Sequence, residues 1–434
     1  MNLNEYKGQK LLNIISTFVF LELILGGTGK LFYLPIRNLI FPFAILFLAC
    51  FIIVNKIVIP KKYIIYIGLI LIYPLYGTIV GLFNNNALLA ILDDINVYFG
   101  ILYLALYYLC VRDDMDKLKN LIDLFIGCSI FIALIAIVLF VTSYFQIKNG
   151  VHFEGVMNSI EYYINYGIIS GSLYGNMFVR VYLPNGIFMQ IALSLLLYRL
   201  LTFKTPKYVC YENIGISILA LGIFATGTRG YWIGGIIVAI STILFVTKIN
   251  IKSVLLSLIL VVVVLGTSYI IFPEEQKVEL QGRVDSISDF THTEPSNSVR
   301  STQLKHLVAK IKEKPVQGHG FGADLVEYDQ ETDRGGRNFE LYYVELVYKT
   351  GAIGIVYLFG VFSLALFRAF KAFRKLSFDD EKSTLLKGWV IGFISMAVST
   401  VSNPYFAGLY GFFIIVLSIL IIETIYTNTF ELRG

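Results

Sequence analysis

Twelve apolar runs divide the chain, and most of them are long enough to cross a lipid bilayer as a helix, which takes about 20 residues. They lie near residues 10–27, 34–54, 63–83, 95–111, 121–145, 181–200, 212–228, 230–247, 253–272, 341–367, 386–402 and 405–425. The runs lack strand-like alternation, and 56% of all residues are hydrophobic, with a mean hydropathy of +0.72. The sequence therefore predicts an all-α integral membrane protein of about twelve transmembrane helices, forming one polytopic domain over residues 1–434.

The positive charges in the connections predict the orientation of this bundle. With a cytoplasmic N-terminus, the inner connections hold twenty Lys and Arg residues, and the short outer ones hold Lys30, Lys148, Arg180 and Arg229. Because Lys and Arg concentrate on the cytoplasmic side, we expect both chain ends to be cytoplasmic. The first run lacks a clear cleavage site and is expected to stay as an anchor. The net charge of +5 thus reflects topology, and nucleic acid is not an expected partner.

Two outer segments are longer than turns, residues 146–180 and the much larger 273–340. The second holds 13 acidic residues against 9 Lys and Arg, unlike the basic inner loops, and we expect it to form a partly helical lid. Within residues 300–314, Leu304, Leu307, Val308 and Ile311 recur at helical spacing. This helix is expected to pack across the mouth of the bundle or lie on the membrane, and a solvated loop helix is the alternative. The sequence "GHGFG" (318–322) after it predicts a turn.

Four charged residues are expected on the outer side of the membrane. Arg229 lies in "FATGTRGYWIGG", Arg180 opens the sixth span in "RVYLPNG", Arg300 starts the lid helix, and Glu340 precedes the tenth span. Guanidinium groups match phosphate oxygens geometrically, so a cluster of them would suit a diphosphate at the outer leaflet. Taken singly, each residue also has a structural explanation. The arginines would anchor helices to lipid headgroups or serve as loop cations, and Glu340 would cap a helix.

Other polar residues also have both a functional and a structural explanation. Asn185 follows Pro184 and would cap or kink a helix, and Glu345 with Lys349 would form an ordinary i,i+4 pair. The pair Asp93–Asp94 would bind a divalent cation or open a helix. The sequence holds no CxxC motif, Cys/His cluster, P-loop or GxGxxG motif, so neither zinc nor a nucleotide is expected.

Several stretches resemble the O-antigen ligase and polymerase superfamily, the Wzy-type membrane glycosyltransferases. They are "TGTRGYWIGG", "RVYLPNG", "VRSTQLKHLVAKIKEKPVQGHGFG" and "ELYYVELVYKTGAIGIVYLFG". The family pattern is an Arg that opens a helix, a Pro and a glycine turn after it, and then a polar position eleven residues before a GxxG pair. Here these are Arg300, Pro315, Gly318–Gly322, Glu340 and Gly351–Gly354. The likeness covers residues 175–365, and the twelve-span plan with its large loop between the ninth and tenth spans implies a GT-C-like fold.

The resemblance implies a polymerase of undecaprenyl-diphosphate-linked oligosaccharide repeat units, for O-antigen or capsule. Ligases of the family that transfer glycan to lipid A core have a histidine where this chain has Glu340, which favours polymerisation. Arg229 and Arg300 would act with Glu340, holding the diphosphate while the carboxylate accepts a proton. We also predict substrate contacts from Arg180, Asn185, Arg337, Asn338 and His319. A ligase, or a flippase or transporter of the same lipids, is the alternative, although a transporter should show paired halves and no repeat is visible.

The implied partners are the lipid-linked oligosaccharide donor and acceptor, the membrane lipids, a chain-length regulator and a flippase. No metal, cofactor or nucleotide sugar is expected, since the donor already carries its activated bond and the arginines supply positive charge. The expected location is the bacterial cytoplasmic membrane, with inversion at the anomeric carbon through a single displacement on its outer face.

Overall fold

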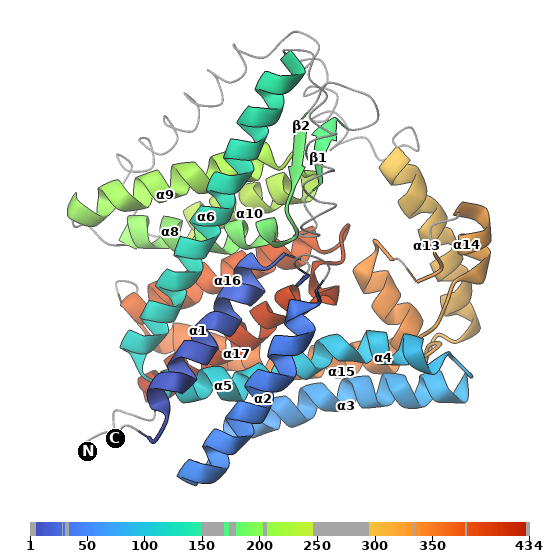
Figure 1. Cartoon of the computed structure of the whole chain (residues 1–434), viewed down its shortest axis with the longest axis horizontal. Coiled ribbons are helices and arrows are strands. Elements are labelled where there is room, and N and C mark those ends of the chain that lie inside the picture. The colour runs from blue at the N-terminus through green and yellow to red at the C-terminus, as the bar shows by residue number, and fades with distance from the viewer. Residues whose placement is uncertain are drawn as a thin grey trace.

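The computed structural model of the chain is built almost entirely from helices (Figure 1). It describes residues 6–27, 29–30, 34–148, 169–172, 179–202, 206–245, 295–332, 335–337, 339–377 and 380–430. The α-helices are α1 (Gln9–Leu25), α2 (Ile36–Asn55), α3 (Lys61–Phe83), α4 (Leu88–Asn96), α5 (Tyr103–Val111), α6 (Met115–Lys148), α8 (Phe188–Thr202), α9 (Pro206–Ala225), α10 (Arg229–Phe245), α13 (Pro295–Glu313), α14 (Val326–Thr332), α15 (Tyr342–Lys375), α16 (Glu381–Ser399) and α17 (Leu409–Phe430). Short 3₁₀ helices are η1 (Val97–Leu102), η3 (Pro184–Ile187) and η4 (Tyr405–Ala407), and the strands are β1 (Ile169–Ser172) and β2 (Val179–Tyr182).

The prediction of a helical membrane protein is confirmed. Within the described ranges, seven helices are long and apolar enough to cross a membrane: Ile36–Asn55, Lys61–Phe83, Leu88–Val111, Met115–Thr142, Pro184–Thr202, Tyr342–Lys375 and Leu409–Phe430. Helices α1, α9, α10 and α16 coincide with four further apolar runs. The run near 253–272 lies outside the described residues.

Two boundaries differ from the sequence prediction. The fourth crossing begins at Leu88 instead of 95, because α4 and α5 are joined end to end through η1. Arg180 does not open a helix: it lies in β2, opposite Gly171 of β1 in an antiparallel hairpin. The following helix starts only at Pro184, whose ring fixes φ near the helical value and suits a first helical position.

Helix α8 lies in the middle of the bundle, where it packs on α9, α10 and α16. Gly392 of α16 permits close approach, since a Cβ there would lie 2.6 Å from the Ile191 Cα of α8. The buried Gln190 side chain joins the same helices. It donates to Ser399 Oγ (3.0 Å) and accepts from Ser395 Oγ (2.8 Å), while Ser399 Oγ also donates to the Gly230 carbonyl (2.8 Å). These bonds fix the first turn of α10 beside the end of α16.

Helix ends that are distant in sequence meet at one end of the bundle. The Lys62 ammonium of α3 pairs with Asp113, just beyond α5, at 3.0 Å and also donates to Thr427 of α17. Arg112, beside Asp113, donates to Gln9 at the start of α1. The start of α1 and the end of α17 therefore lie at the same end of the bundle, which agrees with an even number of crossings.

The predicted lid helix, α13, packs across the opposite end of the bundle with α14 (Figure 1). Its Leu307 is fully buried in a small core with Leu325, Tyr328 and Tyr348, whereas Leu304 is exposed. Only part of the expected apolar stripe therefore faces the protein.

Two polar bonds join α13 to α14 in the lid. Lys310 Nζ lies 2.9 Å from Glu327 Oε1, and His306 Nε2 lies 2.7 Å from Glu331 Oε2. The bond from Lys310 holds the pKa of the Glu327 carboxyl below its ordinary value, and the bond from His306 does the same for Glu331. Both carboxylates are therefore stabilised in their charged form.

Candidate active site

The glycine turn at residues 318–322 is clamped between three helices. Gly318, Gly320 and Gly322 all have positive φ, at 73°, 83° and 76°, which non-glycine residues rarely adopt. At Gly320 a Cβ would lie 2.1 Å from the Gly81 nitrogen of α3. The turn donates backbone hydrogen bonds from Gly320 to Lys349 of α15 (2.7 Å), from Phe321 to Gly77 of α3 (2.9 Å) and from Gly322 to the Asp94 carboxylate of α4 (2.7 Å).

Helix α15 is interrupted where the segment before this turn meets it. Gly351 has φ 60° and ψ −165°, outside the helical region. The next two amides leave the helical ladder, and Ala352 and Ile353 donate instead to the carbonyls of Pro315 and Val316, at 2.9 and 3.2 Å. The break separates a short first part of α15, Tyr342–Thr350, from the long apolar part that follows.

Arg300 and Glu340 form an ion pair above this first part of α15. Arg300 Nε donates to Glu340 Oε2 at 2.9 Å, and their side chains are 23% and 34% exposed, so solvent can reach both. Gln303 Oε1 accepts from the backbone amides of Glu340 (2.9 Å) and Leu341 (3.1 Å). Leu341 is the N-cap of α15, so the carboxylate of Glu340 pairs with the lid and does not cap the helix.

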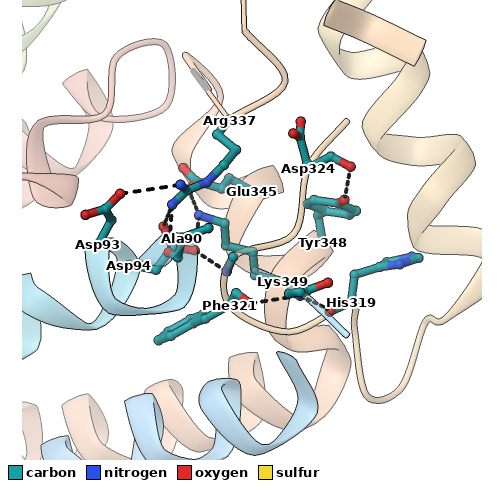
Figure 2. Close-up of polar contacts among 12 residues, drawn as sticks. Ala90, Asp93, Asp94, His319, Phe321, Asp324, Arg337, Glu345, Tyr348 and Lys349 are labelled. Carbon is teal, nitrogen blue, oxygen red and sulfur yellow. Dashed lines mark hydrogen bonds and ion pairs between the residues drawn. The ribbon is translucent and has the colours of Figure 1, made fainter. Parts of the chain in front are cut away.

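A second group of charges lies beside this pair, and Figure 2 shows how its members converge. Arg337 reaches from the loop before α15 to α4, where it contacts Asp94 Oδ1 (3.2 Å), Asp93 Oδ2 (3.5 Å) and the Ala90 carbonyl (2.7 Å). The Lys349 ammonium contacts both Asp94 Oδ2 (2.9 Å) and Glu345 Oε1 (2.6 Å). The Lys349 side chain is only 6% exposed, so these two carboxylates are needed to stabilise its buried positive charge.

A polar cavity of about 550 Å³ brings the two groups together. Its wall contains all of the charged residues just described except Arg300 and Asp93, and Tyr328 and Phe339 of the lid region add aromatic surface. The charged lining residues are Asp94, Arg337, Glu340, Glu345 and Lys349. The cavity thus presents one guanidinium and one ammonium, both already paired, together with a carboxylate held by the Arg300 guanidinium.

The chain is similar to known proteins in two comparisons. A family model described as O-antigen ligase matches residues 214–359, a range that includes Arg229, Arg300 and Glu340. A protein of Shigella flexneri named "O-antigen polymerase" is 26% identical over 417 residues, which cover 93% of this chain and 92% of that protein. The chain is therefore similar to proteins of the O-antigen ligase and polymerase superfamily.

The site residues predicted from the sequence fall into two groups. Arg300, Arg337 and Glu340 come together at the cavity, as described above. Arg229 is the first residue of α10 and is half-buried, but it is outside the cavity lining. Its neighbour Gly230 lies beside Ser399 and Asn403, and Pro404, one residue further, lines the cavity. Arg229 therefore lies near the cavity but not in its wall.

Two residues predicted to contact substrate have hydrogen-bond partners within the protein. Asn185 is 1% exposed and its amide donates to the Ile24 carbonyl of α1. His319 Nε2 lies 2.8 Å from the Lys310 carbonyl, and its ring packs against Tyr348 at a centroid distance of 4.9 Å, away from the charged cluster (Figure 2). Asn338 and the side chain of Arg180 lie outside the described residues. Direct substrate contact from these four stays a prediction.

Three residues that line the cavity, Asp94, Glu345 and Lys349, are not among the site residues predicted from the sequence. Glu345 and Lys349 form the expected i,i+4 pair, and Lys349 in addition bonds Asp94 of α4. Asp93 and Asp94, for which the sequence leaves a divalent-cation site open, contact Arg337 and Lys349 through their carboxylates. Charge balance in the sequence could have indicated this pairing. An acidic pair and a basic residue that are expected near the same membrane surface can form an ion pair there.

Proposed function

We propose that the chain is a polymerase of undecaprenyl-diphosphate-linked oligosaccharide repeat units, of the O-antigen or capsule type. It would act as an inverting glycosyltransferase at the outer face of the bacterial cytoplasmic membrane. The observation that carries the proposal is the Arg300–Glu340 pair, 2.9 Å apart, at a cavity of about 550 Å³. The name of the Shigella flexneri relative, "O-antigen polymerase", supports the same reaction.

The chemistry asks for two groups, and this pair offers both. An acceptor hydroxyl attacks the anomeric carbon of the donor, a new C–O bond forms, and the bond from that carbon to the diphosphate oxygen breaks. The Glu340 carboxylate takes the hydroxyl proton as general base. The Arg300 guanidinium, which Glu340 neutralises in the free protein, turns to the departing diphosphate and stabilises its negative charge. The anomeric configuration inverts because there is one displacement.

The charges around the cavity support a reaction run by guanidinium groups. The carboxylates of Asp93 and Asp94 already form ion pairs with Arg337 and Lys349. A divalent cation would have to displace these partners in order to bind there. We infer that arginines supply the positive charge at the diphosphate, from Arg300 and from Arg229 at the neighbouring helix start. Arg180 and Asn338 would then contact the glycan.

An apolar groove of about 320 Å³ begins beside the cavity. Tyr342, Tyr343 and Leu346 line it, close in sequence to Glu340 and Glu345, and Phe359, Phe362 and Phe393 continue it. Val356 and Phe359 on the same stretch of α15 are exposed. This surface suits a polyprenyl tail, since a lipid-anchored donor must place an apolar chain and a charged headgroup in adjacent environments.

The proposed membrane topology has twelve crossings with both chain ends cytoplasmic and the 273–340 segment outside. Its support is the charge count in the connections together with the meeting of α1 and α17 at one end of the bundle. A flippase that delivers the lipid-linked unit and a regulator of chain length are further partners that this function would require or use.

Ligation is the second candidate function, because the matching family model is described as O-antigen ligase. A ligase would use the same donor and transfer the glycan to lipid A core. The two functions differ only in the acceptor. The acidic Glu340 and the name of the relative favour polymerisation.

Reconstitution tests this proposal. Purified protein in liposomes is given one lipid-linked repeat unit, alone or with lipid A core, and products are separated by size. Polymerisation predicts a ladder of longer lipid-linked glycans without added core. Product formed only when core is present would establish the ligase. Movement of the lipid between leaflets without any new glycosidic bond would establish the transporter and overturn the proposal.

A further inference from the structure

A second polar cavity, of about 600 Å³, lies next to the candidate active site. Its polar wall is formed by Arg37, Asn38, Asp93 and Asn96, and the rings of Phe41 and Tyr410 add aromatic surface. These residues come from α2, α4 and the start of α17. None of them belongs to the set predicted from the sequence to bind substrate.

The two cavities share a boundary. Ala407 of η4 lines both of them. On the other side, Asp93 lines the second cavity and the next residue, Asp94, lines the first. Arg337 contacts both carboxylates, at 3.5 and 3.2 Å. A molecule that filled the second cavity would therefore lie directly beside the cavity that Glu340 lines.

The charges of the second cavity suit a neutral ligand. Its one cation, Arg37, donates to Glu22 Oε1 at 2.9 Å and to the Gly27 carbonyl at 3.1 Å, and both side chains of the ion pair are only 9% exposed. The guanidinium is thus already neutralised. Asp93 adds negative charge with a side chain that is 76% exposed. In the described part of the chain, this wall offers a diphosphate no cation without a carboxylate partner.

The open hydrogen-bonding groups are those that recognise sugar hydroxyls. Asn38 and Asn96 are exposed, and neither side chain forms a hydrogen bond in the part of the chain that the structure describes. Each amide offers two donors and one acceptor oxygen. Phe41 is held by an edge contact to Tyr103, with ring centroids 5.3 Å apart, so it presents a fixed apolar face on which the C–H face of a sugar ring can pack.

We propose that this second cavity binds the acceptor glycan, and that the acceptor hydroxyl reaches Glu340 past Ala407. The inference rests on the proposed function, because polymerisation needs two glycans in one enzyme. The first cavity, with its charged groups and adjoining apolar groove, takes the lipid diphosphate and the bond that breaks. The neutral cavity takes the sugars of the second substrate through Asn38, Asn96 and Asp93.

The test uses a probe that can be an acceptor but not a donor: the octyl glycoside of one repeat unit, prepared from the polysaccharide of the producing cells. The full-length protein is placed in lipid nanodiscs as wild type, Asn38→Ala, Asn96→Ala and the double variant. Asn120→Ala is the matched control, because Asn120 is an exposed asparagine at the opposite end of the bundle, in the first turns of α6. Equilibrium binding of labelled glycoside and the KM values for glycoside and lipid-linked donor are measured.

The double variant is expected to bind the glycoside about tenfold more weakly, the effect of losing roughly two neutral hydrogen bonds. Its KM for the glycoside should rise in parallel, while its KM for the donor stays within about twofold of the wild-type value. Unchanged glycoside binding, or an equal rise in both KM values, overturns the assignment of this cavity to the acceptor. If wild-type protein forms no product, the proposed function fails, and the binding measurement still decides whether the cavity holds glycan.

Discussion

Arg300 Nε lies 2.9 Å from Glu340 Oε2, although the two residues are 40 positions apart. The pair joins the lid helix α13 to the loop that starts α15, and Gln303 fixes the backbone on the same side. Each charge is stabilised by the other while the site is empty of substrate. On our account, an incoming diphosphate competes for the guanidinium and frees the carboxylate to act as a base.

Replacing Arg300 by Gln should lower kcat by about 100- to 1000-fold, because a donor to the developing negative charge is lost. Arg300→Lys should keep part of the activity, since the charge remains and the planar fork is lost. Chain extension by purified protein measures both effects. Lys305→Gln, an exposed cation on the same helix, serves as the control. Wild-type activity in Arg300→Gln would contradict the assignment.

Asp94→Asn should destabilise the protein, because it leaves Lys349 and Arg337 with one carboxylate fewer in a poorly solvated cluster. Breaking a buried pair in this way costs roughly 3–5 kcal/mol. Asp93→Asn is the matched control, and its loss should be below about 1 kcal/mol because this side chain is mostly exposed. Thermal unfolding in detergent compares the variants. The double variant with Lys349→Met should lose less than the sum of the single losses, and strict additivity would show that the two groups do not interact.

Gly320→Ala should lower the unfolding temperature and abolish chain extension. The φ of 83° is unfavourable for alanine by about 1–2 kcal/mol, and the new Cβ would lie 2.1 Å from the Gly81 nitrogen. Gly360→Ala controls for the substitution itself, since nothing lies within 4 Å of a Cβ at that helical position. Both variants are compared by thermal unfolding. Equal unfolding temperatures would mean that the turn does not depend on its glycine.

Arg229→Lys distinguishes diphosphate binding from anchoring to lipid headgroups. Lysine keeps the charge but lacks the planar fork, so a diphosphate contact predicts a loss of at least about tenfold in kcat/KM for the donor. Arg374→Lys is the control. It lies at an exposed position in the last turn of α15 and should leave the rate unchanged. If Arg229→Lys is as active as wild type, the residue is an anchor and the diphosphate contact is withdrawn.

Much of the fold could be predicted because lipid imposes a simple pattern on the sequence. Runs such as 34–54 and 63–83 correspond to α2 and α3 within a few residues. The glycine turn at 318–322 was also predictable, since alternating glycines that need positive φ have few other uses. The lid helix followed from apolar residues at helical spacing, and Leu307 is indeed buried.

The remaining features depend on contacts between distant segments. Asp94 of α4 contacts Lys349 of α15, and the Lys310 carbonyl accepts a hydrogen bond from His319 Nε2. Both contacts depend on how the segments pack in three dimensions. No local periodicity reports such pairings. The break at Gly351 is similar, because the amides that leave the helical ladder bond to Pro315 and Val316. Arg180 looked like a helix start because the apolar run begins there, but strand pairing with Gly171 decided its conformation.

The most direct test of the account is the Glu340→Gln variant, with binding of the lipid-linked donor and chain extension measured on the same preparation. Glutamine keeps the size and most of the polarity of the side chain but is not a base. The account predicts near-normal donor binding and a loss of chain extension of about 100- to 10,000-fold. A variant that binds donor and extends chains at the wild-type rate would show that Glu340 does not accept the proton.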